Sequence, residues 1–440
     1  MAVRESDAYA NLLLPVRLDR AKLSEADAAL ATELTYGTLR MSGYYDRVIE
    51  LAARRKVTEI DPGILDVLRL ASHQLLSMRV AQHAAVDEAV SLAKTVGSNS
   101  ATGFVNGVLR TITRSPAEEW HARALATAKT DDERLSIEHS HPEWVVRAFR
   151  QALGSEGREE ELVTLLTADN LPPRVSLAEL PGLGVQDDGG TGSGSRARFS
   201  PVGLAMSGGD PMKLTNVRTG TTRVQDEGSQ LAALALSRAR PIVRGEVWLD
   251  LCAGPGGKAA LLAAEAAVGG ATLIANELIP ARAGLVRNAL RVFDPAPEVW
   301  ELDGTRIGDD HAGEFDRILL DAPCTGLGAL RRRPEARWRK KPKDVADLAE
   351  LQRQLIVSAL RALKPGGILA YVTCSPHLGE TRVAVQTALR DPQVRLLDTQ
   401  AVLGDVSAHP LELPHSPHVQ LWPHRHGTDA MFIQLLEKVE

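Results

Sequence analysis

The sequence predicts an all-α N-terminal domain followed by an α/β domain built on an open, mostly parallel sheet. Three observations support this. Residues 1–138 carry apolar side chains at helical spacing and show no strand-like alternation. From residue 225 onward, short apolar runs alternate with helical patterns, which is typical of β–α–β units. The turn Gly254-Pro255-Gly256-Gly257 separates the first of these runs from the helix after it.

Length and composition are those of an ordinary soluble protein with two or three domains. The 440 residues are 44% apolar and 24% charged. We find no apolar run of membrane-spanning length and no signal-peptide core in 1–11. Three cysteines cannot form a disulfide framework, so we expect a cytoplasmic protein, and we expect a monomer. At a net charge of −5, any contact with nucleic acid must rest on local basic patches.

The first domain, 1–138, should be a helical bundle. Apolar spacing predicts helices over 27–36, 64–78 and 85–95. Asp61-Pro62 fits an N-cap followed by the first helical position. Taken alone, this pattern indicates a helical interaction module.

The next part, 139–215, is predicted to be a small α/β connector whose function the sequence does not reveal. It contains two helical patterns at 141–153 and 159–169, a strand at 172–177 and a glycine/serine tract at 187–195, which we interpret as a flexible loop.

The last part, 216–440, should carry the chemistry. The predicted strands are 247–251, 272–275, 299–302, 317–320 and 368–373, the predicted helices are 225–238, 258–267, 280–292 and 345–363, and 419–422 with 430–436 could close the sheet as a hairpin. Open α/β sheets bind ligands at the carboxyl ends of their strands.

Acidic residues follow three of these strands. Glu277, Asp303 and Asp321 stand at successive strand ends, beside the glycine turn. Such a set suits an adenine nucleoside, which needs a ribose-hydroxyl acceptor, a partner for its amino group and a close main-chain approach. A nicotinamide dehydrogenase would also need a hydride-transfer constellation, and we find none.

Two cysteines follow the fourth and fifth strands. Cys324 and Cys374 stand outside the apolar runs at ligand-facing positions, so their thiols should lie near one cleft. Cys252 is expected to pack or to support the cofactor. No C-x-x-C or paired-histidine spacing supports a metal, and the histidines at 409, 415, 418, 424 and 426 lack ligand spacing.

The strongest basic run lies between 330 and 343. It holds one acid, Glu335, and one tryptophan, Trp338. Its eight cations are Arg331, Arg332, Arg333, Arg337, Arg339, Lys340, Lys341 and Lys343. A charge run is often only a solvated face. Directly after Asp-Ala-Pro-Cys, this one is expected to bind RNA at the mouth of the catalytic cleft, through phosphate contacts and a stacking ring.

The first third of the chain resembles the NusB-like RNA-binding domain. The motifs that carry this are Leu34-Thr35-Tyr36-Gly37-Thr38-Leu39-Arg40, Ala84 to Val90, and Gly103-Phe104-Val105-Asn106-Gly107-Val108-Leu109-Arg110. The resemblance implies an RNA partner, although NusB-like domains also serve protein contacts.

The last part resembles the NOL1/NOP2/Sun family of S-adenosylmethionine-dependent RNA cytosine-C5 methyltransferases. The matching motifs are Gln225 to Gln230, Asp250 to Lys258, Asp321 to Gly328, and Thr373-Cys374-Ser375. The resemblance implies a Rossmann-like class I methyltransferase domain. Gly254 and Thr325 depart from the family, which often has Ala and Ser there, Pro376-His377 departs too, and the family often has Asp at Glu277. With its NusB-like start, the whole chain is similar to the members that methylate small-subunit (16S) ribosomal RNA.

The resemblance also implies roles for single residues. The cofactor loop would be Cys252, Ala253, Gly254, Pro255, Gly256, Gly257 and Lys258, with Glu277 on the ribose and Asp303 on the adenine edge. Asp321 would lie near both cofactor and base. Cys374 corresponds to the nucleophile that adds to C6 of cytosine, and Cys324 to the residue that helps release product. Two alternatives stay open: a transfer RNA substrate, or a non-catalytic RNA-binding module of the antitermination type.

Overall fold

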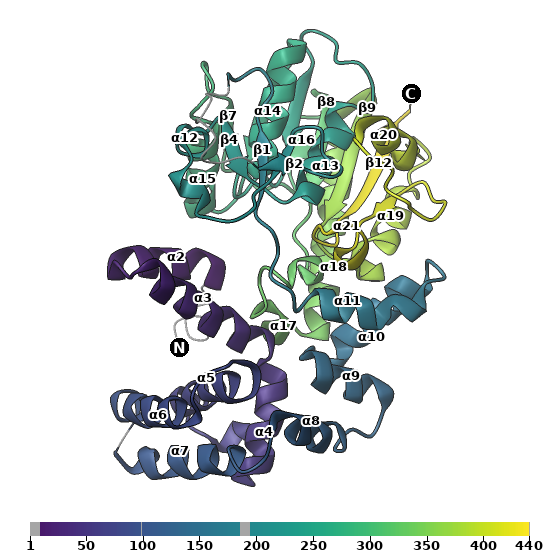
Figure 1. Ribbon diagram of the computed structural model, residues 1–440. Coiled ribbons are helices and arrows are strands. Elements are labelled where there is room, and N and C mark those ends of the chain that lie inside the picture. The colour runs from purple at the N-terminus through teal and green to yellow at the C-terminus, as the bar shows by residue number, and fades with distance from the viewer. Residues whose placement is uncertain (1–8, 98, 185–193, 440) are drawn as a thin grey trace. The chain divides into compact units, whose positions relative to one another are not determined.

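The computed structural model describes residues 9–439, except 98 and 185–193, and these form two compact units (Figure 1). The helical unit comprises Met1–Pro172 together with Leu330–Lys340. The catalytic unit comprises Pro173–Ala329 and Lys341–Glu440. Each unit is described separately below.

The helical unit contains no strand among its described residues. Its helices are α2 (Ala10–Ala21), α3 (Glu25–Arg40), α4 (Ser42–Ala53), α5 (Pro62–Ser77), α6 (Gln82–Val96), α7 (Asn99–Ile112), α8 (Ala117–Leu125), α9 (Asp131–His139), α10 (Glu143–Gly154), α11 (Leu162–Ala168) and α17 (Ala336–Arg339), with 3-10 turns at Val57–Glu59 and Glu159–Glu161. The predicted cap of α5 is confirmed, because the Asp61 carboxylate accepts hydrogen bonds from the N–H groups of Gly63 and Ile64.

The core of this unit lies between α4, α5, α6 and α7. Tyr45, Val48, Leu68 and Leu109 are fully buried there. These side chains recur every three or four residues along their helices, which turns each apolar stripe toward the same core.

The division of the chain differs from the three parts that we predicted. The predicted connector 139–215 is split at Pro172, because α10 and α11 pack with the helices before them while the following strands join the catalytic unit. The basic segment Leu330–Lys340 also changes unit. It lies within the catalytic sequence but packs with the helical unit.

A small antiparallel sheet opens the catalytic unit. Its strands, in spatial order, are β2 (Ser195–Arg196), β3 (Gly203–Ala205), β1 (Ser176–Glu179) and β4 (Thr222–Val224), with η3 (Pro211–Lys213) and α12 (Thr215–Thr219) between β3 and β4. The loop predicted at 187–195 falls mostly on 185–193, outside the described residues, and Ser195 begins β2.

The large sheet confirms the predicted open α/β architecture. Its strands, in spatial order, are β10 (Val394–Leu396), β12 (Phe432–Lys438), β9 (Leu363–Thr373), β8 (Phe315–Asp321), β5 (Val247–Asp250), β6 (Thr272–Asn276) and β7 (Glu298–Trp300), and β11 (Val419–Gln420) pairs with β12. The strands from β9 to β7 are parallel, and β12 runs antiparallel to β9. The predicted hairpin is present, with Val419 opposite Ile433.

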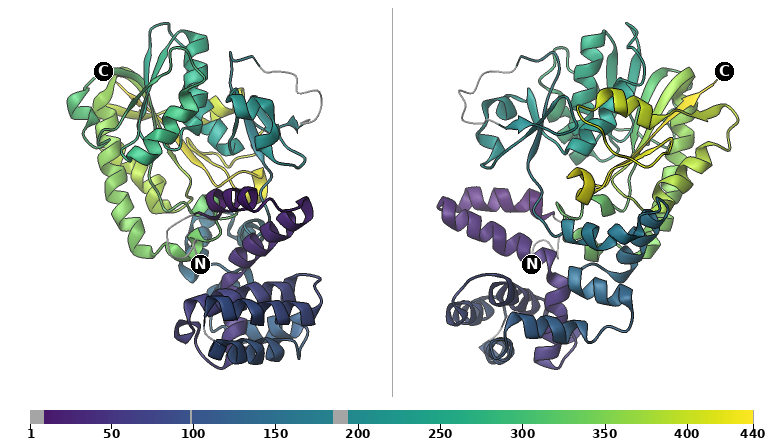
Figure 2. Two further views of the ribbon diagram at one scale, coloured as in Figure 1. Left: turned by 90° about the vertical axis from the view of Figure 1, so that its left-hand side faces the viewer. Right: turned by 45° about the vertical axis from the view of Figure 1, so that its right-hand side comes forward.

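Helices cover both faces of this sheet (Figure 2). Their bounds are α13 (Glu227–Ser237), α14 (Gly257–Gly269), α15 (Pro280–Leu290), α16 (Ile307–Asp310), α18 (Pro342–Ala362), α19 (Arg382–Ala388), α20 (Thr399–Val406) and α21 (Pro423–His426), with 3-10 turns η4 (Leu327–Ala329) and η5 (Leu378–Glu380). Helices α13, α14, α15 and α20 supply one buried core, and α16, α18 and α19 supply the other. Neighbouring strand residues such as Trp248 and Leu249 alternate between the two cores.

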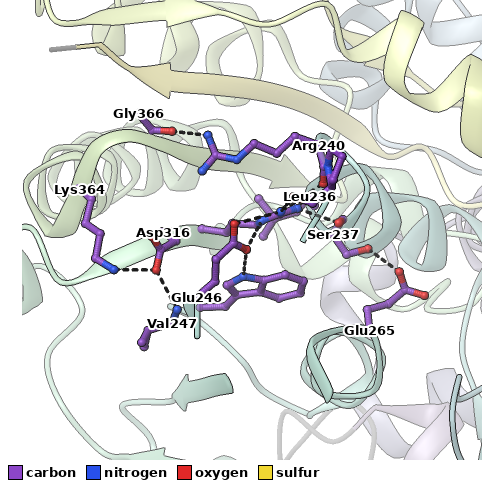
Figure 3. A network of polar contacts seen from close by, with 12 residues as sticks. Leu236, Ser237, Arg240, Glu246, Val247, Glu265, Asp316, Lys364 and Gly366 are labelled. Atoms are coloured by element: carbon purple, nitrogen blue, oxygen red, sulfur yellow. Dashed lines mark hydrogen bonds and ion pairs between the residues drawn. The ribbon is translucent and has the colours of Figure 1, made fainter. Parts of the chain in front are cut away.

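A buried ion pair joins β8 to the segment before β5 (Figure 3). Arg317 is fully buried, its Nε donates to Glu246 over 2.9 Å, and its guanidinium also donates to backbone carbonyls such as that of Ser237. The indole N–H of Trp248 donates to the same carboxylate. Every charge taken out of water here has a partner, as burial requires. This network lies at the amino ends of β5 and β8, whereas the predicted site lies at their carboxyl ends.

No helix in the described part of the chain has both the length and the apolar character needed to cross a bilayer.

Candidate active site

The glycine turn connects β5 to the start of α14. Gly256 has φ of 103°, a left-handed conformation that favours glycine. A Cβ on Gly256 would also press into Ala289 and the backbone of Val286, both on α15. The turn is therefore built for close main-chain packing, and it leaves the first N–H groups of α14 facing the strand ends.

Glu277, directly after β6, closes one side of this turn. Its carboxylate accepts hydrogen bonds from the N–H of Gly254 (3.2 Å) and of Ile279 (3.0 Å). Arg282 lies 3.4 Å from the same carboxylate and donates to the carbonyl of Gly254. Glu277 is buried, so these contacts hold its carboxylate in place at the ligand edge of the sheet.

The side chain of Asn276 links the loop after β7 to the end of β5, beside the glycine turn. Its amide donates to the carbonyls of Leu251 and Leu302 and accepts from the N–H of Leu302. Asp303, the next residue, is exposed, and its carboxylate accepts from the N–H (3.0 Å) and hydroxyl (2.7 Å) of Thr305. The structure thus gathers the glycine turn, Glu277 and the Asp303 loop.

Asp321, at the end of β8, forms an ion pair with Lys258 on the first turn of α14. The ammonium lies 2.8 Å from the carboxylate. Burial opposes the charge on Lys258, but Asp321 outweighs it and the pKa of the lysine is raised, with a smaller contribution from Cys374. Lys258 therefore stays protonated, with its charge near both Asp321 and Cys374.

The two predicted cysteines lie side by side. Cys324 follows β8 and Cys374 follows β9, its parallel neighbour, and their sulfur atoms are 3.5 Å apart. The hydrogen bond with Cys374 and then burial raise the pKa of the Cys324 thiol well above its usual range, helped by the charges of Glu380 and Asp321. Cys324 is accordingly a neutral thiol beside Cys374.

A buried glutamate that sequence reasoning missed joins the two cysteine loops. Glu380 is fully buried on η5, six residues after Cys374. Its carboxylate accepts from the N–H (2.7 Å) and hydroxyl (2.5 Å) of Thr325, the residue after Cys324. The Thr325 hydroxyl also lies 3.2 Å from that of Ser375. The sequence around Glu380 does not reveal this role, because it depends on Thr325, 55 positions away.

Gly328 allows a second close approach between these loops. Its N–H donates to the carbonyl of Cys374 over 2.8 Å, and its carbonyl accepts from Ala430 over 2.9 Å. A Cβ at this position would overlap with the Ala430 carbonyl. Because it has no side chain, Gly328 lets the segment after Cys324 form hydrogen bonds with the backbones of both Cys374 and Ala430.

Three further groups complete the picture of the strand ends. Burial, followed by the charge of Asp321, raises the pKa of Asp250 to about 8. Burial also raises the pKa of Cys252, which packs with the α18 side of the sheet. Gln225 is buried next to Gly257, and its side-chain amide has no hydrogen-bond partner in the part of the chain that the structure describes. The motif Gln225 to Gln230 carries part of the family resemblance, but the sequence does not predict that the Gln225 amide lacks a partner among the described residues.

The basic segment corrects one predicted site residue. Arg337 is fully buried, and its guanidinium donates to the carbonyls of Arg40, Ser140 and Asp169 and to the Asn170 side chain. These partners all belong to the helical unit, so Arg337 is a structural residue and is not available to RNA. Burial lowers its pKa to about 10, which leaves it charged at neutral pH.

The other residues of the segment vary in exposure. Arg331 is buried, Arg332, Arg333, Arg339 and Lys340 are partly exposed, and Trp338 is 44% exposed. Arg333 and Arg339 both lie over the ring of Tyr9. A charge run in the sequence thus contains both a buried anchor and an accessible face.

Histidines near the C-terminus serve the fold. His426 is buried, accepts from the N–H of Trp422 and donates to the carbonyl of Leu411. Among the residues that the structure describes, no group of three or more His, Cys, Asp or Glu side chains could hold a metal ion.

Comparison with known proteins gives the class of this fold and site. A family model for 16S rRNA methyltransferase RsmB/F matches 240–437, and one for the NusB family matches 1–114. Both resemblances seen in the sequence are therefore confirmed: the chain joins a NusB domain to an α/β methyltransferase domain.

Relatives cover the whole chain. The candidate methyltransferase Rv1407 of Mycobacterium tuberculosis is 48% identical and covers 100% of this chain and 94% of its own. The Bacillus subtilis protein named "Probable ribosomal RNA small subunit methyltransferase B" is 30% identical, covering 99% and 96%. The crystal structure of PH0851 has the same fold, with a TM-score of 0.79 over 96% of this chain and 93% of its own at 23% identity. The chain belongs to the RsmB/F family of methyltransferases.

Proposed function

We propose that this protein transfers a methyl group from S-adenosylmethionine to C5 of a cytosine in 16S ribosomal RNA, through a covalent bond between Cys374 and C6 of the base. The observation that carries the proposal is the pair of thiols 3.5 Å apart at neighbouring strand ends. One attacking thiol and a second thiol within its reach suit a reaction that must both form and break a bond to the base.

The strand ends fit an adenosyl cofactor. Gly257 is partly exposed at the start of α14, and beside it lies the side-chain amide of Gln225, which has no hydrogen-bond partner among the described residues. Glu277 would accept the ribose hydroxyls and Asp303 the adenine edge, with 252–258 as the enclosing loop. When bound, S-adenosylmethionine supplies an electrophilic methyl group on its sulfonium sulfur.

Cys374 begins the reaction. The Cys374 thiol gives its proton to solvent, and the thiolate adds to C6. The electrons of the C5–C6 double bond move through C4 to N3, which takes up a proton from solvent and returns it when the double bond is restored. The positive charge of Lys258 attracts the thiolate, since these two groups interact. The Asp321 carboxylate accepts a hydrogen bond from the protonated N3 and, with Lys258, stabilises the charge that develops on the ring. C5 is now nucleophilic enough to accept the methyl group.

Cys324 completes it. Before Cys374 bonds to the base, its hydrogen bond and charge keep the pKa of Cys324 high. Once Cys374 is bonded to C6 these two effects end, and the pKa of Cys324 falls, while burial and the charges of Glu380 and Asp321 still raise it. Cys324 then gives its proton to water more readily and acts as the base. It removes the proton from C5, the C–H electrons restore the C5–C6 double bond, and the Cys374 thiolate leaves.

The RNA assignment rests on the relatives and on the helical unit. The Bacillus subtilis relative is named for small-subunit ribosomal RNA, and the NusB family includes RNA-binding domains. The accessible part of the basic segment, Arg332, Arg333 and Trp338, would add phosphate and stacking contacts.

The two cysteines make the proposal testable. Cys374→Ala should be inactive and form no covalent RNA. Cys324→Ala should add and methylate but eliminate slowly, so it should accumulate a protein–RNA adduct that survives denaturing electrophoresis and carries the methyl group. An adduct from Cys374→Ala alone would reverse the two roles. Activity in both variants without any adduct would exclude covalent catalysis.

The substrate needs a separate measurement. We expect 5-methylcytosine at one position of 16S ribosomal RNA in cells that contain the protein, and not in cells without it. If 5-methylcytosine differed only in transfer RNA, the substrate would be transfer RNA and the proposed chemistry would stand. No difference in either RNA would favour the non-catalytic alternative.

A further inference from the structure

The catalytic unit has a polar pocket whose lining includes none of the three cysteines. It has a volume of about 260 Å³ and lies between the segment from α12 to β4 and the C-terminal end of α15. Its polar lining includes Arg218, Thr219, Arg223, Asn288 and Arg291. The proposed mechanism uses none of these residues.

The charge of this pocket is of one sign. Three of its lining residues are arginines, and none is an aspartate or glutamate. Arg223 is half-buried, and burial followed by the nearby charge of Arg291 lowers its pKa. None of the three arginines forms an ion pair with an acid among the described residues. Two guanidinium groups held together without a counter-charge repel each other, and a bound anion would remove that repulsion.

The donors suit a phosphate group. Arginine presents planar N–H pairs that match phosphate oxygens, and the Thr219 hydroxyl and Asn288 amide can donate beside them. A carboxylate is smaller and has fewer acceptors. A volume of about 260 Å³ leaves room for a phosphate group beside these donors.

The pocket adjoins the proposed cofactor loop. Ala289, one of its lining residues, is the residue against which Gly256 packs. Arg223 stands two residues before Gln225, whose side chain contacts the start of α14 at Gly257. An RNA strand that places its cytosine at Cys374 would therefore run over the same unit that carries these arginines.

We infer that Arg218, Arg223 and Arg291 form a binding site for a backbone phosphate of the RNA substrate, within the catalytic unit itself. The inference rests on the proposed function for the identity of the ligand. It gives the catalytic unit its own contact with the RNA strand, independent of the NusB-like unit and of the basic segment at 330–340.

The test compares Arg223→Gln, Arg291→Gln and the double variant with Arg244→Gln, which removes the same charge from an exposed position before β5. The probe is unmodified 16S ribosomal RNA transcribed in vitro. The double variant should bind it about tenfold more weakly, with a salt dependence of log K shallower by about 0.7 for one lost phosphate contact. Affinity for S-adenosylmethionine and the binding of Arg244→Gln should match those of the wild type.

The outcomes separate this inference from the proposed function. An unchanged salt slope in the double variant overturns the site, even if the wild type methylates cytosine C5. A lowered slope, with methylation at another atom, supports the site and overturns the function. Because Arg291 is exposed, Arg291→Gln keeps the test valid if Arg223→Gln fails to fold. Inorganic phosphate is titrated in parallel, and loss of its binding without a change in RNA binding would make this a small-anion site instead.

Discussion

The carboxylate of Glu277 occupies the space that a side chain at position 254 would need, and Gly254 leaves that space open. A Cβ on Gly254 would overlap with Glu277 Oε2 and would press on the guanidinium of Arg282. Both positions depart from the family pattern, which often has alanine at the first and the shorter aspartate at the second. The geometry explains why these departures occur together: removing a methyl group from the turn makes room for one more methylene in the acid.

The first prediction follows from this shared space. Gly254→Ala should displace the Glu277 carboxylate and weaken S-adenosylmethionine binding at least tenfold, about 1.4 kcal/mol. The double variant Gly254→Ala with Glu277→Asp should recover most of the affinity, since the shorter acid leaves room for the methyl group. Calorimetric titration of the cofactor measures both. Equal losses in the single and double variants would show that the two positions act independently.

The second prediction concerns Glu380 as a positioning residue. Glu380→Gln removes a charge that helps to raise the pKa of Cys324 and weakens the hold on Thr325. Turnover should fall by about tenfold to a hundredfold, because small displacements of reacting groups are costly. Cofactor affinity should not change.

A pH profile separates this role from simple damage to the fold. Since Glu380→Gln lowers the pKa of the Cys324 thiol, the rising limb of the pH–rate profile should move to lower pH. The control is Glu350→Gln, which neutralises an exposed glutamate on α18. A profile with lower amplitude and an unmoved limb would contradict the electrostatic part of the prediction.

The third prediction divides the basic segment into anchor and contact residues. Arg337→Gln should destabilise the helical unit by about 3 kcal/mol or more, because several buried carbonyls lose a charged donor. Neutralising the partly exposed Arg332 and Arg333 should instead weaken RNA binding and its salt dependence. Urea unfolding and RNA titration at several salt concentrations measure the two effects. Equal stability of Arg337→Gln and wild type would mean that the guanidinium is dispensable.

The fourth prediction is a loss of stability in mild acid. Burial lowers the pKa of His426 in the folded protein to about 4, whereas an unfolded histidine titrates near 6.5. Between these values the unfolded chain binds more protons, so stability rises with pH. The neutral His426 stabilises the folded protein fully above about pH 6.5, and this stabilisation is lost as the pH falls toward 4. The loss is about 2 kcal/mol at pH 5.

Other buried histidines, such as His418, titrate in the same range, so the comparison must isolate His426. His426→Gln cannot take up a proton, and its stability should fall less than that of the wild type between pH 7 and pH 5. Denaturant unfolding at both pH values gives the difference. Parallel curves for the two proteins would show that His426 is not held neutral.

Sequence reasoning predicted the positions of the candidate site residues where the signal was local. Each strand end carries its residue directly after an apolar run, so Glu277, Asp321, Cys324 and Cys374 could be placed at one edge of a parallel sheet. Adjacent parallel strands then bring the two thiols together, as observed.

The rest depended on contacts between distant segments. Glu380 contacts Thr325 across 55 positions, and neither residue differs in type from many others in the chain. The arginine run posed the opposite problem, because the sequence does not distinguish Arg331 and Arg337, which are buried, from the six cations that are not. Only the carbonyls gathered around Arg337 distinguish it, and these come from residues as distant as 40 and 169.

The membership of Leu330–Lys340 in the helical unit has a consequence for synthesis on the ribosome. A nascent chain that ends at residue 172 already contains α2 to α11, yet the carbonyls of Arg40, Ser140 and Asp169 still await the guanidinium of Arg337. Strands β1 to β8 are all made during that wait. Domains usually fold in the order of their synthesis. Here the unit that emerges first is completed only after most of the second has been translated, so its last helix arrives as a late, stabilising insertion.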